Sequence, residues 1–271
     1  MNELKIGILY FSPTNTTKKI CKAIAFGMGN KLATKINISD KTEREKLLTD
    51  PKSQIDPLDY LIVGAPVYTG KLPLPVIEVL ESIKGIGQKC TAIVLYGNRD
   101  YGIALHHMVD MLSKAGFSII SAGAFIGQHS YSDIIPVAMG RPDEKDLMKA
   151  KELGKKNLTI SSFLTPEDIP RQLDFFSKSK GYTPVRPVFI QEKCSDCTSC
   201  SKSCPVGIIS KENGDYLSRE AKKLCLGCMA CVRQCSKNAR IAKPNLIDKL
   251  LIKYVLKGAS RNRLEPISIY H

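Results

Sequence analysis

The sequence predicts an α/β fold, a five-stranded, doubly wound parallel sheet, followed by a small α+β domain rich in cysteine. Apolar strand-like runs alternate with amphipathic helical runs over the first 160 residues, and turn residues separate them. Eight of the ten cysteines then fall between residues 194 and 235. Alternating strands and helices imply right-handed crossovers, with helices on both faces of the sheet.

Each expected strand is a short apolar run, and each expected helix carries apolar residues at helical spacing. The strands cover residues 4–10, 32–38, 58–65, 90–96 and 118–126. The helices cover residues 18–28, 41–48, 74–83, 103–115 and 143–160. Sheets of this kind bind ligands at the carboxyl ends of their strands. The loops after the first, third and fourth strands are therefore the candidate binding loops.

Proline and serine interrupt the periodicity after residue 160, which divides the chain into segments. We expect an α/β domain over 1–160, a linker or strap over 161–185, the cysteine-rich domain over 186–240, and a helix with a tail over 241–271. The last segment has an apolar stripe that either docks on one of the domains, as we expect, or lies on a membrane surface. The stripe consists of Leu246, Ile247, Leu250, Leu251, Tyr254 and Val255.

Composition excludes several classes of protein. Apolar residues make up 43% and charged residues 24% of the chain, which is ordinary for a globular protein. No run approaches the roughly 20 apolar residues of a transmembrane segment. The N-terminus lacks a signal-peptide pattern, so we expect a cytoplasmic protein whose clustered cysteines bind metal rather than form disulfides.

Positive charge concentrates toward the C-terminus. The net charge is +14, and residues 186–271 alone hold 16 Lys/Arg against 7 Asp/Glu. A basic surface attracts acidic proteins, nucleic acid or anionic lipid, and it is also compatible with a solvated face that binds nothing. Beside a metal centre, we expect an acidic redox protein as the partner and no nucleic acid.

One cysteine spacing occurs twice. Three cysteines at two-residue intervals wrap one iron–sulfur cubane, and the fourth cysteine of each run ligates the other cluster. We therefore expect one [4Fe–4S] cluster on Cys194, Cys197, Cys200 and Cys235, and a second on Cys204, Cys225, Cys228 and Cys231. Two zinc sites of four thiolates each are the alternative, although zinc ribbons favour separated C-x-x-C pairs.

This region resembles the bacterial two-cluster ferredoxins over about 50 residues, including their internal repeat. Pro205 follows the last cysteine of the first run, as it does in that family. Ser236 stands at the matching position of the second run, where proline is usual. Proline is not a ligand, so the departure affects the local turn and leaves the ligands unchanged.

The loop after the first strand is rich in hydroxyl groups. Together with the N–H groups of a helix start they form a neutral cradle for phosphate. Glycine–lysine and G-x-G-x-x-G nucleotide motifs are absent from it. The loop resembles the FMN phosphate loop of flavodoxins, with asparagine at the usual glycine, where a left-handed conformation is tolerated. A plain helix cap is the alternative. The residues concerned are Ser12, Thr14, Asn15, Thr16 and Thr17.

Two further loops fall where flavodoxins contact the isoalloxazine ring. The chain has no tryptophan, so Tyr68 and Tyr101 are the candidates for stacking on it, unless they simply cover the sheet edge. The resemblance implies FMN and the strand order 2-1-3-4-5. It assigns to the flavin the residues Pro66, Val67, Tyr68, Thr69 and Gly70 of one loop and Gly97, Asn98, Arg99, Tyr101 and Gly102 of the other.

The two halves together resemble the flavodoxin–ferredoxin fusion proteins of anaerobic bacteria and archaea. The resemblance implies electron transfer between the clusters and FMN, with an acidic ferredoxin or flavodoxin as partner. One alternative is a reductase of a small molecule, which needs an open pocket between residues 66–71, 97–102 and 127–133. Another is a regulatory module without flavin. We expect His129 to be a polar loop residue, and Cys21 and Cys90 to be buried thiols.

Overall fold

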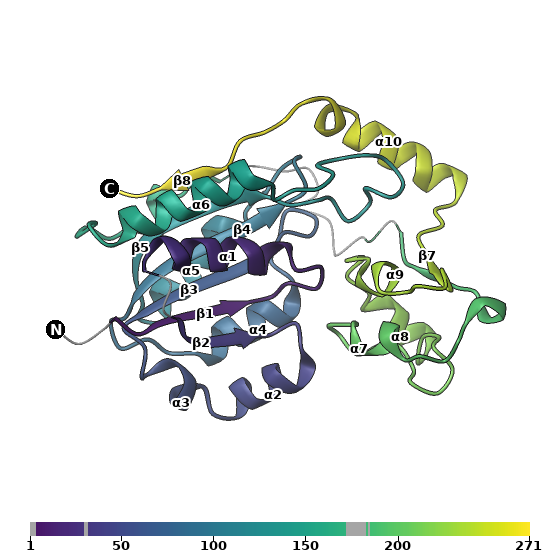
Figure 1. Ribbon diagram of the computed structural model, residues 1–271, viewed down its shortest axis with the longest axis horizontal. Helices are drawn as coiled ribbons and strands as arrows, with labels where there is room; N and C mark the ends of the chain where they lie inside the picture. The colour runs from purple at the N-terminus through teal and green to yellow at the C-terminus, as the bar shows by residue number, and fades with distance from the viewer. Residues whose placement is uncertain (1–3, 30–31, 172–182, 184) are drawn as a thin grey trace.

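The computed structural model describes residues 4–29, 32–171, 183 and 185–271, and it consists of a large and a small part (Figure 1). The large part contains a sheet of order β2-β1-β3-β4-β5-β8, which confirms the predicted order 2-1-3-4-5 of the parallel strands. These five strands are β1 (Ile6–Tyr10), β2 (Leu32–Asn37), β3 (Tyr60–Pro66), β4 (Lys89–Tyr96) and β5 (Ser118–Ile126).

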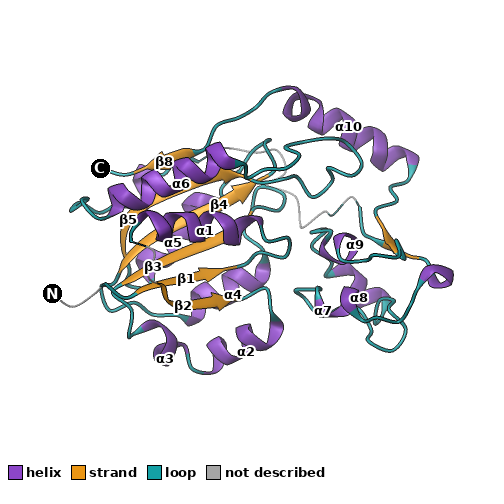
Figure 2. Cartoon of the chain, viewed as in Figure 1, coloured by secondary structure: helices purple, strands orange, loops and turns teal. Residues whose placement is uncertain are grey.

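Helices cover both faces of the sheet, and each face has its own apolar core (Figure 2). α1 (Thr16–Gly27) and α6 (Glu144–Asn157) lie on one face. Glycines let these two helices meet closely, because a Cβ on Gly154 would lie 2.0 Å from the carbonyl oxygen of Ile24. The other face carries α2 (Lys41–Thr49), α3 (Pro51–Ile55), α4 (Leu74–Ser82) and α5 (Ala104–Lys114).

The strands β1, β3, β4 and β5 are buried along nearly their whole length, as expected for a parallel sheet covered on both sides, whereas the edge strand β2 is largely exposed or half-buried. Cys21 and Cys90 are fully buried, which confirms that they are core thiols. Burial raises the pKa of the Cys21 thiol to about 12. The chain after α6 runs along the sheet, where Leu164 N donates to Ile119 O at 2.7 Å and η1 (Pro166–Asp168) follows. Residues 172–182 and 184 of the expected linker lie outside the described residues.

The C-terminal segment differs from its prediction. α10 (Leu246–Arg261) docks through Ile252 and Leu256, whereas five of the six residues of the predicted stripe are exposed. The prediction that the stripe docks is therefore wrong except for Val255, which packs against the same apolar cluster as Ile252. The tail then forms β8 (Ile267–Ile269), a sixth strand antiparallel to β5 that sequence analysis did not predict.

The small part is built from short elements. Its strands β6 (Val188–Phe189) and β7 (Arg240–Ile241) pair antiparallel and bring together the two ends of the cysteine-rich segment. Between them lie η3 (Gln191–Lys193), α7 (Ser199–Lys202), α8 (Arg219–Lys223) and α9 (Ala230–Arg233). The strands of the large sheet point toward this part, so the carboxyl edge of the sheet faces it (Figure 2). Among the described residues, every helix is too short or too polar to cross a bilayer.

Candidate metal centres and flavin edge

The two cysteine runs adopt the same backbone conformation. Thr198 (φ 60°) immediately precedes α7, and Met229 (φ 59°) precedes α9 at the matching position of the second run. Two further matched pairs are also left-handed, Asp196 with Gly227 and Gly207 with Asn238. A non-glycine residue in the left-handed backbone conformation costs about 1–2 kcal/mol, and it persists only where the surrounding structure holds it there. The repeat in the sequence is therefore also a repeat in backbone conformation, and each cysteine run wraps around a similar pocket.

The eight cysteines divide between two pockets, four to each. Each pocket takes three cysteines from one run and the fourth cysteine of the other run, so the runs exchange their last members. We call the first four the outer set and the second four the inner set. The outer set is Cys194, Cys197, Cys200 and Cys235. The inner set is Cys204, Cys225, Cys228 and Cys231.

The order of the cysteines along the chain fits a cubane better than zinc, because zinc ribbons favour separated C-x-x-C pairs. A zinc ion would hold four sulfurs at about 2.3 Å from one centre. Within the described residues, no three His, Cys, Asp or Glu side chains form a group that could hold one metal ion. Four cysteines line each pocket, which is the number of thiolates that hold a [4Fe–4S] core.

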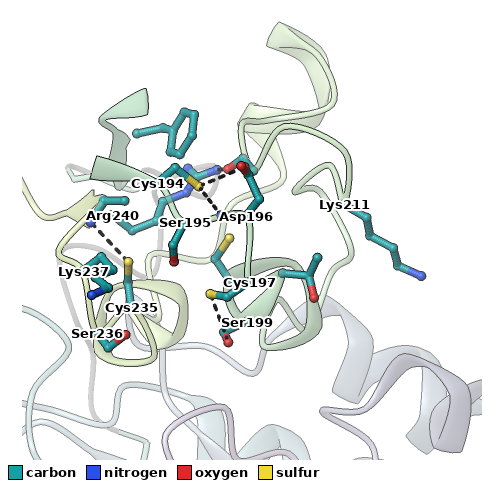
Figure 3. A pocket seen from close by; sticks show the side chains of 15 residues that line it. Cys194, Ser195, Asp196, Cys197, Ser199, Lys211, Cys235, Ser236, Lys237 and Arg240 are labelled. Carbon is teal, nitrogen blue, oxygen red and sulfur yellow. Dashed lines mark hydrogen bonds between the residues drawn. The ribbon is translucent and has the colours of Figure 1, made fainter. Parts of the chain in front are cut away.

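Backbone N–H groups already point at the sulfurs of the outer set. Asp196 N donates to Cys194 Sγ at 3.4 Å, and Ala239 N donates to Cys235 Sγ at 3.2 Å. Figure 3 shows Cys194, Cys197 and Cys235 around the same space, arriving from different segments of the chain. Such N–H···S contacts are a usual part of iron–sulfur sites and help to set their potential.

The two sets differ in their surroundings. Cys197 of the outer set is exposed, and hydrogen bonding with Ser199 lowers the pKa of its thiol. In the inner set, burial raises the pKa of Cys228 to about 12 and also raises the pKa of Cys231. A metal ligand must be a thiolate, so these thiols would need the positive charge of a bound metal to lose their protons.

The inner set lies against the large part. Leu226 packs on the core beneath the loop after β3, and Arg233 Nη2 donates to His129 O at 3.1 Å. A Cβ on Gly227 would lie 3.1 Å from the hydroxyl of Tyr131. Burial raises the pKa of Tyr68 well above its ordinary value, and the nearby Cys228 adds to the effect. The inner set therefore borders the loops that follow β3 and β5.

The first candidate flavin loop is shaped to receive an anion. Asn15 has φ 64°, a left-handed conformation that asparagine tolerates, and its side chain does not cap α1. The first turn of α1 contains no acidic residue. Ser12 Oγ accepts from Lys18 N at 3.1 Å, and the buried hydroxyl of Thr17 has no hydrogen-bond partner among the described residues. An unpaired buried hydroxyl beside helix N–H groups fits a phosphate oxygen. Thr14 and Thr16 lie half-exposed in the same loop.

The second loop forms a tight turn after β3. Tyr68 N donates to Lys71 O at 3.0 Å, and Lys71 N donates to Tyr68 O at 3.1 Å. The two residues between them, Thr69 (φ 51°) and Gly70 (φ 72°), are both left-handed, as in a type I′ turn. A Cβ on Gly102 would lie 2.5 Å from Gly70 O, so the loops after β3 and β4 touch at backbone level. Pro66 and Val67 lead into the turn and are half-buried.

The third loop differs most from the expectation. Tyr101 is 1% exposed and packs edge-on against Tyr96 in the core, so it does not lie at the edge where a flavin ring would stack. The side chain of Asn98 instead holds the C-terminal segment. Its Nδ2 donates to Ala259 O at 2.8 Å, and its Oδ1 accepts from Leu264 N at 2.9 Å. Asn98 acquires this role through contacts with residues far away in the sequence, so no local sequence motif indicates it.

His129 is more deeply enclosed than a polar loop residue. Its ring occupies the space left by Gly97, where a Cβ would lie 2.2 Å from the ring. Burial, together with the positive charges of Arg99 and Arg233, lowers the pKa of His129 to about 4. The imidazole is therefore neutral, and its Nδ1 accepts from Tyr131 N at 3.0 Å. Within the third loop, Gly102 contacts Gly70 of the second loop, Gly97 contacts the His129 ring, and Arg99 lies close enough to His129 to affect its pKa.

The cysteine region matches known proteins in sequence. Residues 193–240 match the model of the 4Fe-4S dicluster domain family. Over 64 residues the chain is 34% identical to pyruvate synthase subunit PorD of Methanocaldococcus jannaschii, covering 23% of this chain and 72% of that protein. It is 33% identical over 60 residues to the same subunit of Methanothermobacter marburgensis, covering 22% and 67%.

Solved structures match the large part at low identity. A flavodoxin from the domain Archaea is 19% identical, with a TM-score of 0.40, covering 58% of this chain and 97% of that one. Rubredoxin oxygen:oxidoreductase from Desulfovibrio gigas is 18% identical, with a TM-score of 0.41, covering 56% and 34%. The strand order itself carries the assignment of the large part as flavodoxin-like. Through residues 193–240 the chain belongs to the 4Fe-4S dicluster domain family, and it is a fusion of such a domain with a flavodoxin-like domain.

Proposed function

We propose that this protein passes electrons between an external carrier and FMN through two [4Fe–4S] clusters in series. The observation that carries the proposal is the division of the eight cysteines into two interleaved sets around two pockets. In the proposal the outer set holds one cluster and the inner set holds the other. When bound, the clusters supply single-electron transfer and the flavin supplies one- or two-electron transfer.

The surroundings of the two sets give the path a direction in space. The outer set opens to solvent at Cys197, and the exposed Lys211 and Lys237 line its pocket. Positive charge there favours docking of an acidic carrier such as a ferredoxin or flavodoxin. The inner set borders Tyr68, so an electron would pass from the carrier to the outer set, the inner set and then the flavin edge.

FMN is assigned to the three loops at the carboxyl edge. The N-terminus of α1, with Ser12, Thr14, Asn15, Thr16 and Thr17, would hold the phosphate. The turn Pro66–Gly70 would lie beside the ring, with Tyr68 stacking on it, while Gly97, Arg99 and Gly102 would complete the edge. The unpaired hydroxyl of Thr17 supports this assignment. Asn98 and Tyr101 would contribute backbone alone, because their side chains are occupied elsewhere.

The contacts at the edge favour a relay over a small-molecule reductase. A reductase needs residues 66–71, 97–102 and 127–133 to enclose an open pocket. Leu226, Gly227 and Arg233 of the dicluster domain contact residues of this edge, and they cover part of it.

The proposed division of the chain is a flavodoxin-like domain over 1–160, a strap over 161–185, a dicluster domain over 186–240 and a C-terminal segment over 241–271. A reducing cytoplasm would suit the thiolate ligands.

Anaerobic purification tests the proposal, with iron, sulfide, zinc and flavin measured on one sample. We expect about eight iron atoms, about eight sulfides and about one FMN per chain. Cys21→Ala is the matched control, since this thiol lies in the core of the large part and should leave the iron content unchanged. Zinc in place of iron would refute the clusters, and full iron without flavin would refute the FMN assignment alone.

A further inference from the structure

The internal repeat is broken by one buried charge. Ile209 of the first run and Arg240 of the second occupy matching positions, five residues after Cys204 and Cys235 respectively. Both are buried, at 5% and 1% exposure. Ile209 lines the pocket of the inner set, and Arg240 lines the pocket of the outer set. Two sites with the same ligands and the same backbone therefore differ by a guanidinium.

Rings and backbone hold the Arg240 side chain in place. Its guanidinium carbon lies 5.1 Å from the ring centroid of Phe189 and 4.8 Å from that of Tyr216. Its Nη2 donates to Gly214 O and lies 3.9 Å from a carboxylate oxygen of the exposed Asp215. A Cβ on Gly214 would lie 3.6 Å from Cys194 Sγ, so this end of the guanidinium neighbours an outer-set ligand (Figure 3).

Part of the guanidinium remains unsatisfied. Nε and Nη1 are buried and have no hydrogen-bond partner among the described residues. Buried N–H donors without acceptors cost about 1–3 kcal/mol each, and more when they are charged. Among the described residues, the carboxylate that pairs with Arg240 is that of Asp215, which is exposed to solvent and lies 3.9 Å from Nη2. The remaining donors therefore call for an acceptor, preferably an anionic one, in the pocket that Arg240 lines.

A cubane held by four thiolates meets both needs, since it carries net negative charge and its sulfurs accept hydrogen bonds. We propose that Arg240 donates N–H hydrogen bonds to the outer cluster and raises its reduction potential above that of the inner cluster. This inference rests on the proposed function, because it requires the clusters. Reduction adds one electron to the cluster, and a buried cation stabilises the reduced form more than the oxidised form.

The two proposed clusters would therefore have unequal reduction potentials. Ile209 gives the inner cluster neither charge nor N–H donors, so an electron from a carrier rests on the outer cluster. The outer cluster then serves as the acceptor at the surface, and each onward transfer waits until the flavin is able to accept an electron.

A redox titration followed by electron paramagnetic resonance tests the inference on the full-length protein with its iron content measured. Arg240→Ile gives the outer site the residue of the inner site. We expect the higher of the two cluster midpoint potentials to fall by at least about 59 mV, which corresponds to a tenfold change in the equilibrium constant for one electron. Arg240→Lys keeps the charge and should restore most of the shift. Cys197→Ser should alter the spectrum of that same step, which assigns it to the outer set.

Lys237→Gln is the matched control, because it removes an exposed positive charge from the same pocket and water screens it. Unchanged midpoints in Arg240→Ile, or an equal fall in Lys237→Gln, would overturn the inference. If Arg240→Ile binds too little iron to titrate, Arg240→Gln decides, and it should lower the same midpoint. Wild-type protein without iron–sulfur clusters would refute the proposed function instead, so the two failures are distinguishable.

Discussion

The outer and inner cysteine sets share their spacing and their left-handed turns, yet they lie in opposite environments. The outer set reaches solvent at Cys197 and has lysines beside it. The inner set is desolvated and borders the carboxyl edge of the large sheet. The comparison teaches that cysteine spacing determines what is bound, whereas the residues between and around the ligands determine what each site does. In the proposed electron path, one repeated motif thus supplies both a site at the surface, the outer set, and a site in the interior, the inner set.

The largest expected effect comes from breaking the two sets separately. Cys228→Ser should lower the rate of flavin reduction by an external donor at least about 100-fold, because the inner step is lost. The outer cluster should still accept an electron from the donor. Cys197→Ser should slow the reduction of both the inner cluster and the flavin. Stopped-flow absorbance and rapid-freeze paramagnetic resonance resolve the two cases.

Cys90→Ala is the control for this pair, since its thiol is buried in β4, away from both sets. It should retain all the iron and the wild-type rate. Flavin reduction at the normal rate in Cys228→Ser would contradict the serial path, because an electron would then reach the flavin without the inner cluster.

The next effect concerns the region where the inner set meets the large part. His129 has a folded pKa of about 4, against about 6.5 when unfolded. Between these values the unfolded chain binds more protons, so the free energy of unfolding should fall as the pH drops from 6.5 toward 4. We expect a loss of about 2 kcal/mol over that range. Chemical denaturation at a series of pH values measures it.

His129→Gln should remove most of that pH dependence, while His107→Gln on α5 should leave it intact. An unchanged slope in His129→Gln would show that the enclosure of this imidazole is not what destabilises the acid form. Iron should be measured at each pH, because loss of a cluster would produce a separate change in stability.

The positive charge near the outer set predicts a smaller, salt-dependent effect. Lys211→Glu combined with Lys237→Glu should lower the rate of reduction by an acidic ferredoxin about tenfold at low ionic strength. The difference should fade as salt rises, because these side chains are exposed. Lys84→Glu combined with Lys89→Glu is the matched control, because both side chains are exposed at the opposite end of the sheet and the change in net charge is the same. Equal losses in both variants would indicate an effect of net charge rather than of docking at the outer set.

Much of this architecture could be predicted because local signals carry it. Hydrophobic periodicity identified the five parallel strands, and cysteine spacing identified the eight candidate ligands with their exchange between runs. The misses share one cause, which is pairing between distant segments. β8 is a short strand that forms against β5, and Asn98 is drawn to the C-terminal segment 161 residues or more away. Arg240 is a separate case, because a lone arginine forms no motif and only its comparison with Ile209 at the matching position of the repeat distinguishes it.

The smallest effect tests whether the flavin edge is independent of the clusters. Asn15 has a left-handed backbone conformation at the start of α1. Glycine adopts this conformation freely, whereas alanine adopts it at a cost about 1 kcal/mol higher than that of asparagine. Asn15→Ala should therefore lower FMN affinity about fivefold, whereas Asn15→Gly should keep it near wild type. Iron content should be unchanged in both, because the loop contributes no cysteine. Flavin fluorescence during equilibrium dialysis gives the affinity, and a fall in iron that tracks the loss of flavin would mean that the two halves load their cofactors together.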